Sequence, residues 1–586
     1  MQAVSGLGKR LCFPLCLGLS CGVPRAAAED LSELIAGAWT VAEQRGEANV
    51  AWMTASQGAP QMYSIYPAIG DPANGHWVLN FNIRNWRNGF WPGTLWFLAQ
   101  RTGSDLWRQR ATDWSAPLAA SDNTDHDIGF ITLASLGKGW LYHDDLTDPG
   151  GIYRTFAKTA ITTAATKLDS RFNQPNTSGV PIPAGFTRSW NTPFQDPYPV
   201  CIDNLMNLEV LFMAYEMNGR QPAQRLWFDH ALPHARTTIS RLLRADGSTY
   251  HVVKHFESGQ QIGQIERKCT VQGYGDETTW SRGQAWAIHG FATTYRYARR
   301  DPGTNASDIL TAAQATADYF LSHLPNDFTA DPCNHRVGDF VPPCDFDVAL
   351  GEPVGPWNDG NNDYNSVTGI GLGLGDRRSV LLSFTLRDSA AAAIAASGLI
   401  ELSGQVASPA DQARYLGAAE KILKCLITYD GDDPGTDPDY LCADGDTANP
   451  GILKAGRVLW GDFNRSQLYG DYYFLEALSR YEAITARKRL ADTQQIRRNG
   501  ANVEFEFETN AAAPTLEFRI QRSPDLSEGS WSTVAARTGA GAWSGAAGAS
   551  EETLPDGHKR VKIADPTPGR RGFFRILARS IGGGGP

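Results

Sequence analysis

Hydrophobic residues recur at helical spacing over most of the first 490 positions of the chain. Side chains three and four positions apart share one face of a helix, so this spacing predicts amphipathic helices. The clearest of them are predicted at residues 152–168, 205–218, 223–243, 281–300, 309–324, 389–402, 411–429 and 467–490. They follow one another at short intervals without a fixed repeat length. This favours a single closed toroid of helix pairs over a superhelical array of repeats.

The period changes from helical to alternating near residue 500. Val503, Phe505 and Phe507 alternate with glutamates, which is typical of a strand with one buried face. Five such short strands are predicted, at 503–508, 516–520, 531–536, 561–563 and 573–577. Separated by turns rich in Pro, Gly and Asp, they predict a small β-sandwich over residues 496–580, followed by a flexible tail at 581–586.

The first 28 residues have the pattern of an export signal. Lys9 and Arg10 precede an apolar run, and three alanines end the segment before Glu29. We therefore expect an exported protein, periplasmic or secreted, whose helical domain spans residues 29–495. A lipoprotein anchor at Cys21 ranks second, because Gly18 fits poorly three residues earlier. No later stretch reaches the ~20 apolar residues that a transmembrane helix requires.

Composition narrows the class of partner. The 586 residues carry a net charge of −10 without a basic run or patch, which argues against nucleic acid. Seventeen tryptophans are many, and tryptophan stacks on sugar faces as readily as it fills a core. An acidic ligand would need a locally positive site against this overall field.

One stretch, residues 277–290, carries an unusual set of side chains. Trp280, Arg282, Gln284 and Trp286 lie two apart, so they cannot share one face of a helix. If the segment starts as a loop and continues as a helix, several of them can converge on a cavity. A guanidinium between indoles would form an anion clamp on an apolar floor, which suits an acidic sugar. The alternative interpretation is a surface arginine beside packed tryptophans.

Two carboxylates are the candidate acid and base. Asp127 and Asp203 each precede a predicted helix and have apolar neighbours. Each could simply cap its helix. If they face each other, burial and like charge raise one pKa, and the protonated aspartic acid can act as a general acid at neutral pH.

Several motifs occur in a particular order along the chain. They are His126-Asp-Ile-Gly-Phe130, Ile202-Asp-Asn-Leu-Met-Asn-Leu208, Gly247-Ser-Thr-Tyr-His251, Gln272-Gly-Tyr, Trp280-Ser-Arg-Gly-Gln-Ala-Trp286 and Gly470-Asp-Tyr-Tyr-Phe-Leu-Glu-Ala-Leu478. In this order they resemble glycoside hydrolase family 88, which contains unsaturated glucuronyl hydrolases. The related family 105 usually has Asn where this chain has Gln284. The resemblance covers residues 75–480. It implies a mainly α fold, an (α/α)6 barrel, here followed by the small all-β sandwich-like domain.

The resemblance also implies an activity. Such enzymes hydrate the vinyl ether of a Δ4,5-unsaturated uronic acid at the non-reducing end of oligosaccharides that polysaccharide lyases release. By similarity, Asp203 is the general acid and base, and Asp127 contacts the sugar and influences the protonation of Asp203. The resemblance further implies substrate-binding roles for His251, Gln272, Arg282, Trp286, Trp91 and Trp280. It implies no metal and no organic cofactor, and ulvan or glycosaminoglycans as parent polymers.

Two alternatives stay open at this stage. In the first, Asp127 and Asp203 are the base and acid of an inverting glycosidase that cleaves saturated sugars. In the second, the barrel is a catalytically inactive glycan-binding protein. The presence of both aspartates argues against a pure binder, which needs neither acid.

Overall fold

The structure is a computed structural model, and it describes most of the chain from residue 31 to residue 580. The described ranges are 31–58, 61–143, 147–176, 178–191, 197–324, 340–348, 387–428, 440–442, 449–457, 465–493, 495–499, 502–510, 516–523, 532–538, 549–553, 558–565 and 573–580. The predicted signal at 1–28 and the predicted tail at 581–586 lie outside the described residues.

Helices that alternate between an inner and an outer position form the main body. The inner ones are α2 (Phe90–Thr102), α4 (Ile128–Thr132) with η4 (Leu133–Gly137) and α5 (Lys138–Tyr142), α7 (Asn204–Asn207) with α8 (Glu209–Met217), α10 (Ser281–Ala298), α14 (Ser389–Ser403) and α16 (Leu468–Thr493). The outer ones are α1 (Leu31–Gln57), α3 (Asp105–Ser115), α6 (Ile152–Asp169), α9 (Arg225–Arg241), α11 (Ser307–Ser322) and α15 (Pro409–Ile427).

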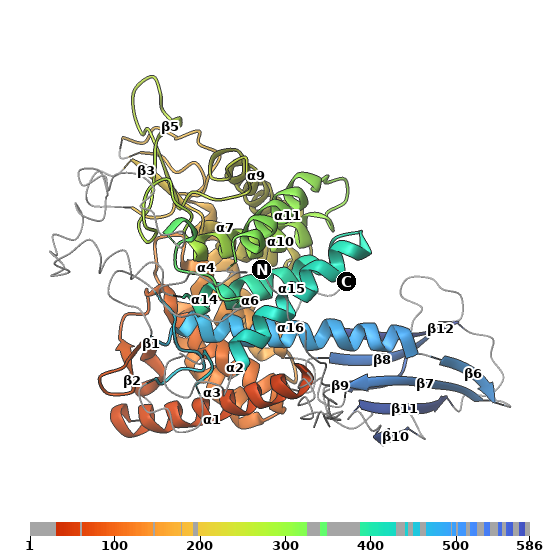
Figure 1. The fold of residues 1–586 in the computed structure, drawn as a ribbon. Helices are drawn as coiled ribbons and strands as arrows, with labels where there is room; N and C mark the ends of the chain where they lie inside the picture. The colour runs from red at the N-terminus through yellow and green to blue at the C-terminus, as the bar shows by residue number, and fades with distance from the viewer. Residues whose placement is uncertain are drawn as a thin grey trace, which may run out of the picture.

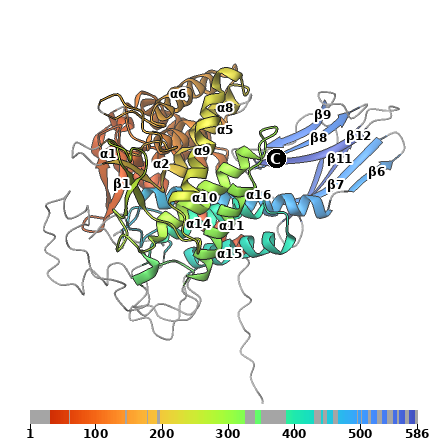
Figure 2. The same ribbon diagram turned by 90° about the horizontal axis from the view of Figure 1, so that it is seen from above.

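Contacts between the inner helices close a ring (Figures 1 and 2). In order, α2 packs on α16, α16 on α14, α14 on α10, α10 on α7 and α7 on α4, and η4 returns to α2. The ring with its outer layer is the predicted (α/α)6 barrel, so the predicted fold class is confirmed.

The two layers differ in their sequence pattern because they differ in burial. In α15 the buried residues are Tyr415, Ala419, Ile422, Leu423 and Leu426, at the three- and four-residue spacing of an amphipathic helix. In α14, by contrast, only Glu401 escapes full burial, and six of the fifteen residues are alanine. Small residues let inner helices approach closely. A methyl group added at Gly398 would lie 2.9 Å from the backbone of His289 on α10.

Short strands lie near the amino-terminal ends of inner helices. β3 (Tyr198–Cys201), β4 (Val252–His255) and β5 (Ile265–Cys269) form an antiparallel sheet in the order β3-β4-β5. Val252 pairs with Cys201 on one side and with Cys269 on the other. Between α1 and α2, β1 (Tyr66–Asp71) pairs with β2 (His76–Asn80).

The carboxyl-terminal region consists of two antiparallel sheets that lie beyond the end of α16 (Figure 1). One sheet has the order β10-β11-β7-β6 and the other the order β12-β8-β9. The strands are β6 (Gln495–Asn499), β7 (Asn502–Asn510), β8 (Leu516–Ser523), β9 (Ser532–Thr538), β10 (Ser550–Thr553), β11 (His558–Asp565) and β12 (Phe573–Ser580). The alternating pattern predicted five of these strands and missed β6 and β10.

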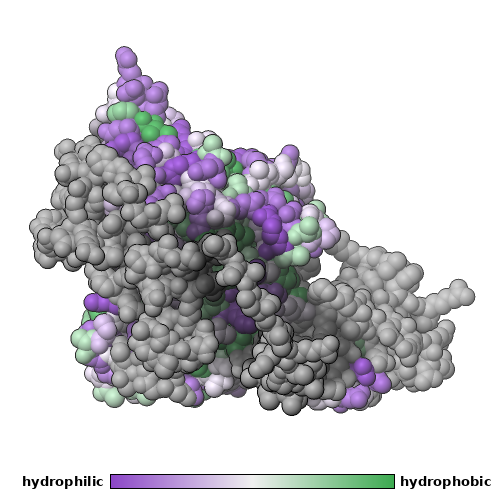
Figure 3. All heavy atoms as spheres, in the orientation of Figure 1, coloured by the Kyte–Doolittle hydropathy of each residue, from purple (hydrophilic) through white to green (hydrophobic). Residues whose placement is uncertain are grey.

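Polar residues cover most of the described surface on the face that Figure 3 shows, and apolar residues form only small patches there. Among the helices of the described ranges, none combines the length and apolar character that crossing a membrane requires.

Candidate active site

A cavity of about 200 Å³ lies at the amino-terminal ends of α2, α4 and α7, beside the β3-β4-β5 sheet. Its lining residues are Trp86, Arg87, His126, Asp127, Phe130, Trp190, Cys201, Asp203, His251, Val271 and Gln272. The structure therefore brings together four residues that the sequence singled out, namely Asp127, Asp203, His251 and Gln272.

The two candidate carboxylates reach this cavity because the starts of α4 and α7 touch. Asp127 directly precedes α4 and Asp203 directly precedes α7, but neither side chain caps its helix. The backbone N–H of Phe130 donates to Asn207 Oδ1 at 2.6 Å. This approach requires glycine at 129, where an added methyl group would lie 2.4 Å from the same oxygen. Asp127 and Asp203 thus do not act as helix caps, and both carboxyl groups line one cavity.

His126 neutralises Asp127. Its Nε2 lies 3.0 Å from Asp127 Oδ1, and its Nδ1 lies 2.9 Å from the carbonyl oxygen of Ser189. Burial by itself would lower the pKa of His126, but the charge of Asp127 and the hydrogen bond to it outweigh burial and raise this pKa to about 9. At neutral pH the ring is therefore an imidazolium that donates from both nitrogens.

Asp203 is the acid whose protonated form the site favours. Burial raises the pKa of this carboxyl group, and the negative charge of Asp127 adds to the effect. The hydrogen bond from Cys201 and the positive charge of His126 act in the opposite direction. Because burial dominates, Asp203 keeps its proton to a higher pH than an exposed aspartate does.

His251 is a neutral hydrogen-bond donor toward the cavity. Its Nδ1 accepts from the backbone N–H groups of Val271 at 3.1 Å and Gln272 at 3.3 Å. In a neutral imidazole the proton then resides on Nε2, which lies 3.9 Å from Asp203 Oδ2. Burial, followed by the charge of Arg282, lowers the pKa of His251 to about 3, so the ring stays neutral at all working pH values.

Arg282 is committed to protein contacts and does not line the cavity. Its Nη1 donates to Asp388 Oδ2 at 2.8 Å and to the carbonyl oxygen of Arg457, and its Nη2 donates to Gln272 Oε1. The guanidinium also lies over the ring of Trp280, 4.5 Å from its centroid. Three of the five N–H groups of Arg282 are therefore used within the protein, and the hold of Arg282 on Gln272 places that amide at the cavity.

The predicted tryptophans lie behind the cavity wall. Trp280 packs against the ring of His251 with centroids 4.3 Å apart, and Trp286 packs against Phe130 at 5.3 Å. Trp91 packs edge-on against Trp114, away from the cavity lining.

Two other indoles, Trp86 and Trp190, line the cavity, and the sequence analysis missed both. Trp86 begins the short 3-10 turn Trp86–Gly89 that leads into α2. Its neighbour Arg87 holds a guanidinium 4.7 Å from the centroid of the Trp86 ring.

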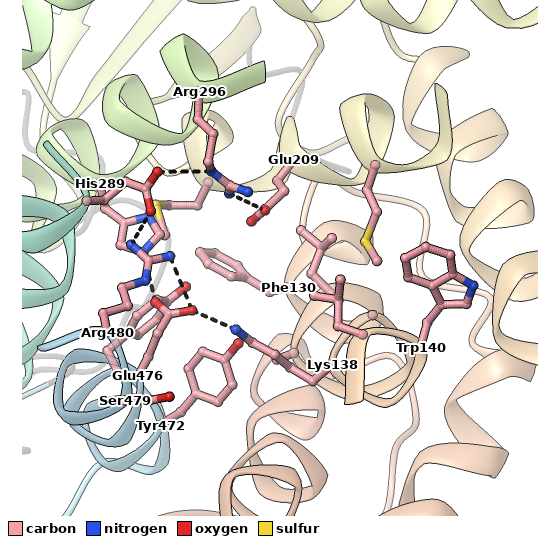
Figure 4. Close-up of a pocket in the computed structure, with 18 of the residues that line it drawn as sticks. Phe130, Lys138, Trp140, Glu209, His289, Arg296, Tyr472, Glu476, Ser479 and Arg480 are labelled. Atoms are coloured by element: carbon pink, nitrogen blue, oxygen red, sulfur yellow. Dashed lines mark hydrogen bonds and ion pairs between the residues drawn. The ribbon is translucent and has the colours of Figure 1, made fainter. Parts of the chain in front are cut away.

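A second cavity of about 380 Å³ lies toward the carboxyl-terminal ends of the inner helices (Figure 4). Buried ion pairs line it. Glu476 contacts Lys138 at 2.8 Å and His289 at 2.9 Å, and Arg296 contacts Glu209 at 2.7 Å. Figure 4 shows these side chains turned toward one another across the barrel. Their charges are matched within the protein, so this region ties the helices together.

Comparisons with known proteins agree with this arrangement. No family model matches the chain. An unsaturated glucuronyl hydrolase of Formosa agariphila is 29% identical over 452 residues, covering 75% of this chain and 89% of that protein. The unsaturated glucuronyl hydrolase of Bacillus sp. strain GL1 is 30% identical over 427 residues, covering 71% and 91%. The crystal structure of an unsaturated glucuronyl hydrolase specific for heparin superimposes with a TM-score of 0.56 and 26% identity, covering 78% and 97%.

Barrel, paired aspartates and relatives together define a glycoside hydrolase. The chain belongs to the unsaturated glucuronyl hydrolases of glycoside hydrolase family 88, the family that its motifs resemble.

Proposed function

We propose that this enzyme removes the Δ4,5-unsaturated uronic acid from the non-reducing end of lyase-generated acidic oligosaccharides, by hydration of the vinyl ether. The observation that carries the proposal is the cavity in which a buried Asp203, with a raised pKa, lies in the same lining as an Asp127 that His126 neutralises. In this pair, burial favours the protonated form of Asp203, while His126 donates to Asp127.

The chemical step needs only a proton and a water molecule. Asp203 gives its proton to C4 of the double bond, and positive charge develops at C5 beside the ring oxygen. The resulting carboxylate then takes a proton from water as the water oxygen bonds to C5, which restores the acid. The product is a hemiketal that opens and releases the neighbouring sugar. No bond to the anomeric carbon is attacked directly.

The cavity lining supports this substrate. Trp86 and Trp190 offer apolar faces for the planar unsaturated ring, and they take the substrate-binding role that the resemblance implied for Trp91 and Trp286. Gln272 and the Nε2–H group of His251 are donors for its hydroxyl or carboxylate oxygens. Because a structural neighbour is specific for heparin, we propose glycosaminoglycan fragments as the first substrates to test, with ulvan fragments second.

We further propose that residues 1–28 direct export, that residues 29–495 form the catalytic domain, and that residues 496–580 form an appended β-module. Substrates made by extracellular lyases would reach an exported enzyme directly. The test of export is the amino-terminal sequence of the mature protein, which should begin after Ala28.

The activity test follows the conjugated double bond. Lyase-generated disaccharides should lose their ultraviolet absorbance with wild-type protein, and Asp203→Asn should slow this by about 10²–10⁴-fold without loss of fold. Asp127→Asn should also impair turnover. A matched saturated disaccharide is the control. Its cleavage would instead favour an inverting glycosidase, and binding without any turnover would favour a glycan-binding protein.

A further inference from the structure

The side chain in closest contact with the candidate acid is a thiol. Cys201 ends β3 two residues before Asp203, and its Sγ lies 2.8 Å from Asp203 Oδ2. The cysteine is 4% exposed and lines the cavity. Burial, together with the negative charge of Asp203, raises the pKa of the Cys201 thiol well above its ordinary value. The sulfur therefore keeps its hydrogen, and the S–H group donates to Asp203 Oδ2.

A metal site is the other chemistry that these residues suggest. One ligand atom each of Cys201, Asp203 and His251 lie within 4.8 Å of one another. However, the backbone N–H groups of Val271 and Gln272 occupy Nδ1 of His251, so Nε2 carries the proton and has no lone pair for a metal. In this trio, Asp203 Oδ2 is the acceptor, and the S–H group of Cys201 and the Nε2–H group of His251 are the donors that face it.

We propose that Cys201 is a positioning residue for the general acid, whose S–H group holds Asp203 Oδ2 and leaves Oδ1 to carry the transferred proton. The catalytic role of Cys201 rests on the proposed function, whereas the contact between Cys201 and Asp203 is independent of it. The donor fixes the rotation of the carboxyl group, so the acidic proton is presented from one defined oxygen. It also stabilises the carboxylate that remains once C4 has been protonated.

Removing the donor should therefore weaken Asp203 as an acid. A hydrogen bond to the ionised form favours that form, so its loss should raise the pH midpoint of Asp203 ionisation. A typical net hydrogen-bond contribution corresponds to a shift of about half to one pH unit. The other charged or titratable groups that act on Asp203 from neighbouring elements are His126, Asp127, His251 and Arg282. All of them remain in a Cys201 variant.

Infrared difference spectroscopy tests the contact without relying on turnover. Subtracting the spectrum of Cys201→Ala from that of the wild type isolates the S–H stretching band of Cys201. This band should lie at lower wavenumber than the band of a thiol without a hydrogen bond, and Asp203→Asn should change its position. The protonated carboxyl band of Asp203, isolated with the same Asp203→Asn variant, should titrate about half to one pH unit higher in Cys201→Ala. Cys201→Ser keeps a donor and should titrate near the wild type.

Cys269 provides the matched control. It lies in the same row of the sheet, two strands from Cys201, and is also buried, yet it does not line the cavity. Cys269→Ala should leave the titration of Asp203 unchanged. If the wild type hydrates unsaturated disaccharides, the basic limb of its kcat profile should shift upward in Cys201→Ala, with a smaller change in KM.

The outcomes separate the two ideas. An S–H band at the position of an unbonded thiol, or the same Asp203 midpoint in Cys201→Ala and wild type, overturns the role of Cys201 whether or not the protein is active. Absence of hydration by the wild type would instead overturn the proposed function. Should Cys201→Ala fail to fold, Cys201→Val fills the space without a donor and carries the same comparison.

Discussion

Arg282→Ala distinguishes a substrate clamp from a structural ion pair. The sequence motif assigns this arginine to the uronate, whereas the structure pairs it with Asp388 at 2.8 Å. The two side chains are 2% and 0% exposed. We therefore expect the variant to lose stability first, and to lose substrate affinity only through the displacement of Gln272, which Arg282 holds.

The size of the stability loss in Arg282→Ala depends on the hydrogen bonds that Asp388 keeps. Removing one partner of a buried ion pair typically costs about 3–5 kcal/mol, because the other charge is left without compensation. Asp388 keeps two donors, since it caps α14 by accepting from the N–H groups of Ala390 at 3.1 Å and Ala391 at 3.2 Å. These bonds place the expected loss near the lower end, about 3 kcal/mol.

The loss should also depend on pH. Burial already raises the pKa of Asp388, and the charge of Arg282 opposes this. Without Arg282 the pKa rises further, so the folded variant binds a proton that the unfolded chain releases. Its stability then falls as pH increases above the unfolded value, and the gap to the wild type should be larger at pH 8 than at pH 5.

Calorimetric Tm values at these two pH values, with kcat and KM from the absorbance assay, provide the measurement. The control is Arg282→Met combined with Asp388→Asn, which removes both charges while asparagine can still cap α14. This double variant should recover part of the lost Tm. A wild-type Tm at both pH values together with a strongly raised KM would refute the ion-pair reasoning and restore Arg282 as the uronate clamp.

Two further predictions test the cavity and the core. Trp86→Ala should lower kcat/KM roughly 3- to 10-fold by raising KM, because one aromatic stacking contact is lost. Trp86→Phe keeps an aromatic ring and should keep most of the activity. An equal loss of activity in both variants would argue against stacking. Burial raises the pKa of Asp471 to about 7 from 3.8, so stability should fall as pH rises between these values. Asp471→Asn should abolish that part of the pH dependence of Tm, and an unchanged slope would contradict it.

The sequence predicted the barrel well where helices have two unlike faces. α6, α9, α11 and α15 are outer helices whose apolar positions repeat at three and four, and their ranges match the pattern within a few residues. Burial on every side did not decide the outcome by itself, because α10 and α14 match predicted ranges although nearly all of their residues are buried, whereas α1, α2 and α3 were not among the predicted ranges. The range 205–218 was predicted as one helix, but the structure separates α7 from α8 at Leu208.

The convergence of residues on one cavity was predictable where chemistry and motif coincide, as for Asp127, Asp203 and His251. Spacing alone could not show which tryptophans reach the cavity, because Trp91 lies on a helix buried on all sides while Trp86 lies in the turn before it. Nor could it show that Arg282 is satisfied by Asp388, a residue 106 positions later. Contacts of that range depend on the closure of the ring.

The common direction of the inner helices has an electrostatic consequence. α2, α4, α7 and α10 all begin at the end of the barrel where Asp127 and Asp203 lie. The first turn of a helix carries a partial positive charge, up to about half an elementary charge in a long helix, and for parallel helices these partial charges add at one end. The backbone itself thus provides a positive potential at the cavity of a chain whose formal charge is −10. At this end of the barrel the peptide dipoles add to the positive charges of Arg87 and His126, which line the same cavity.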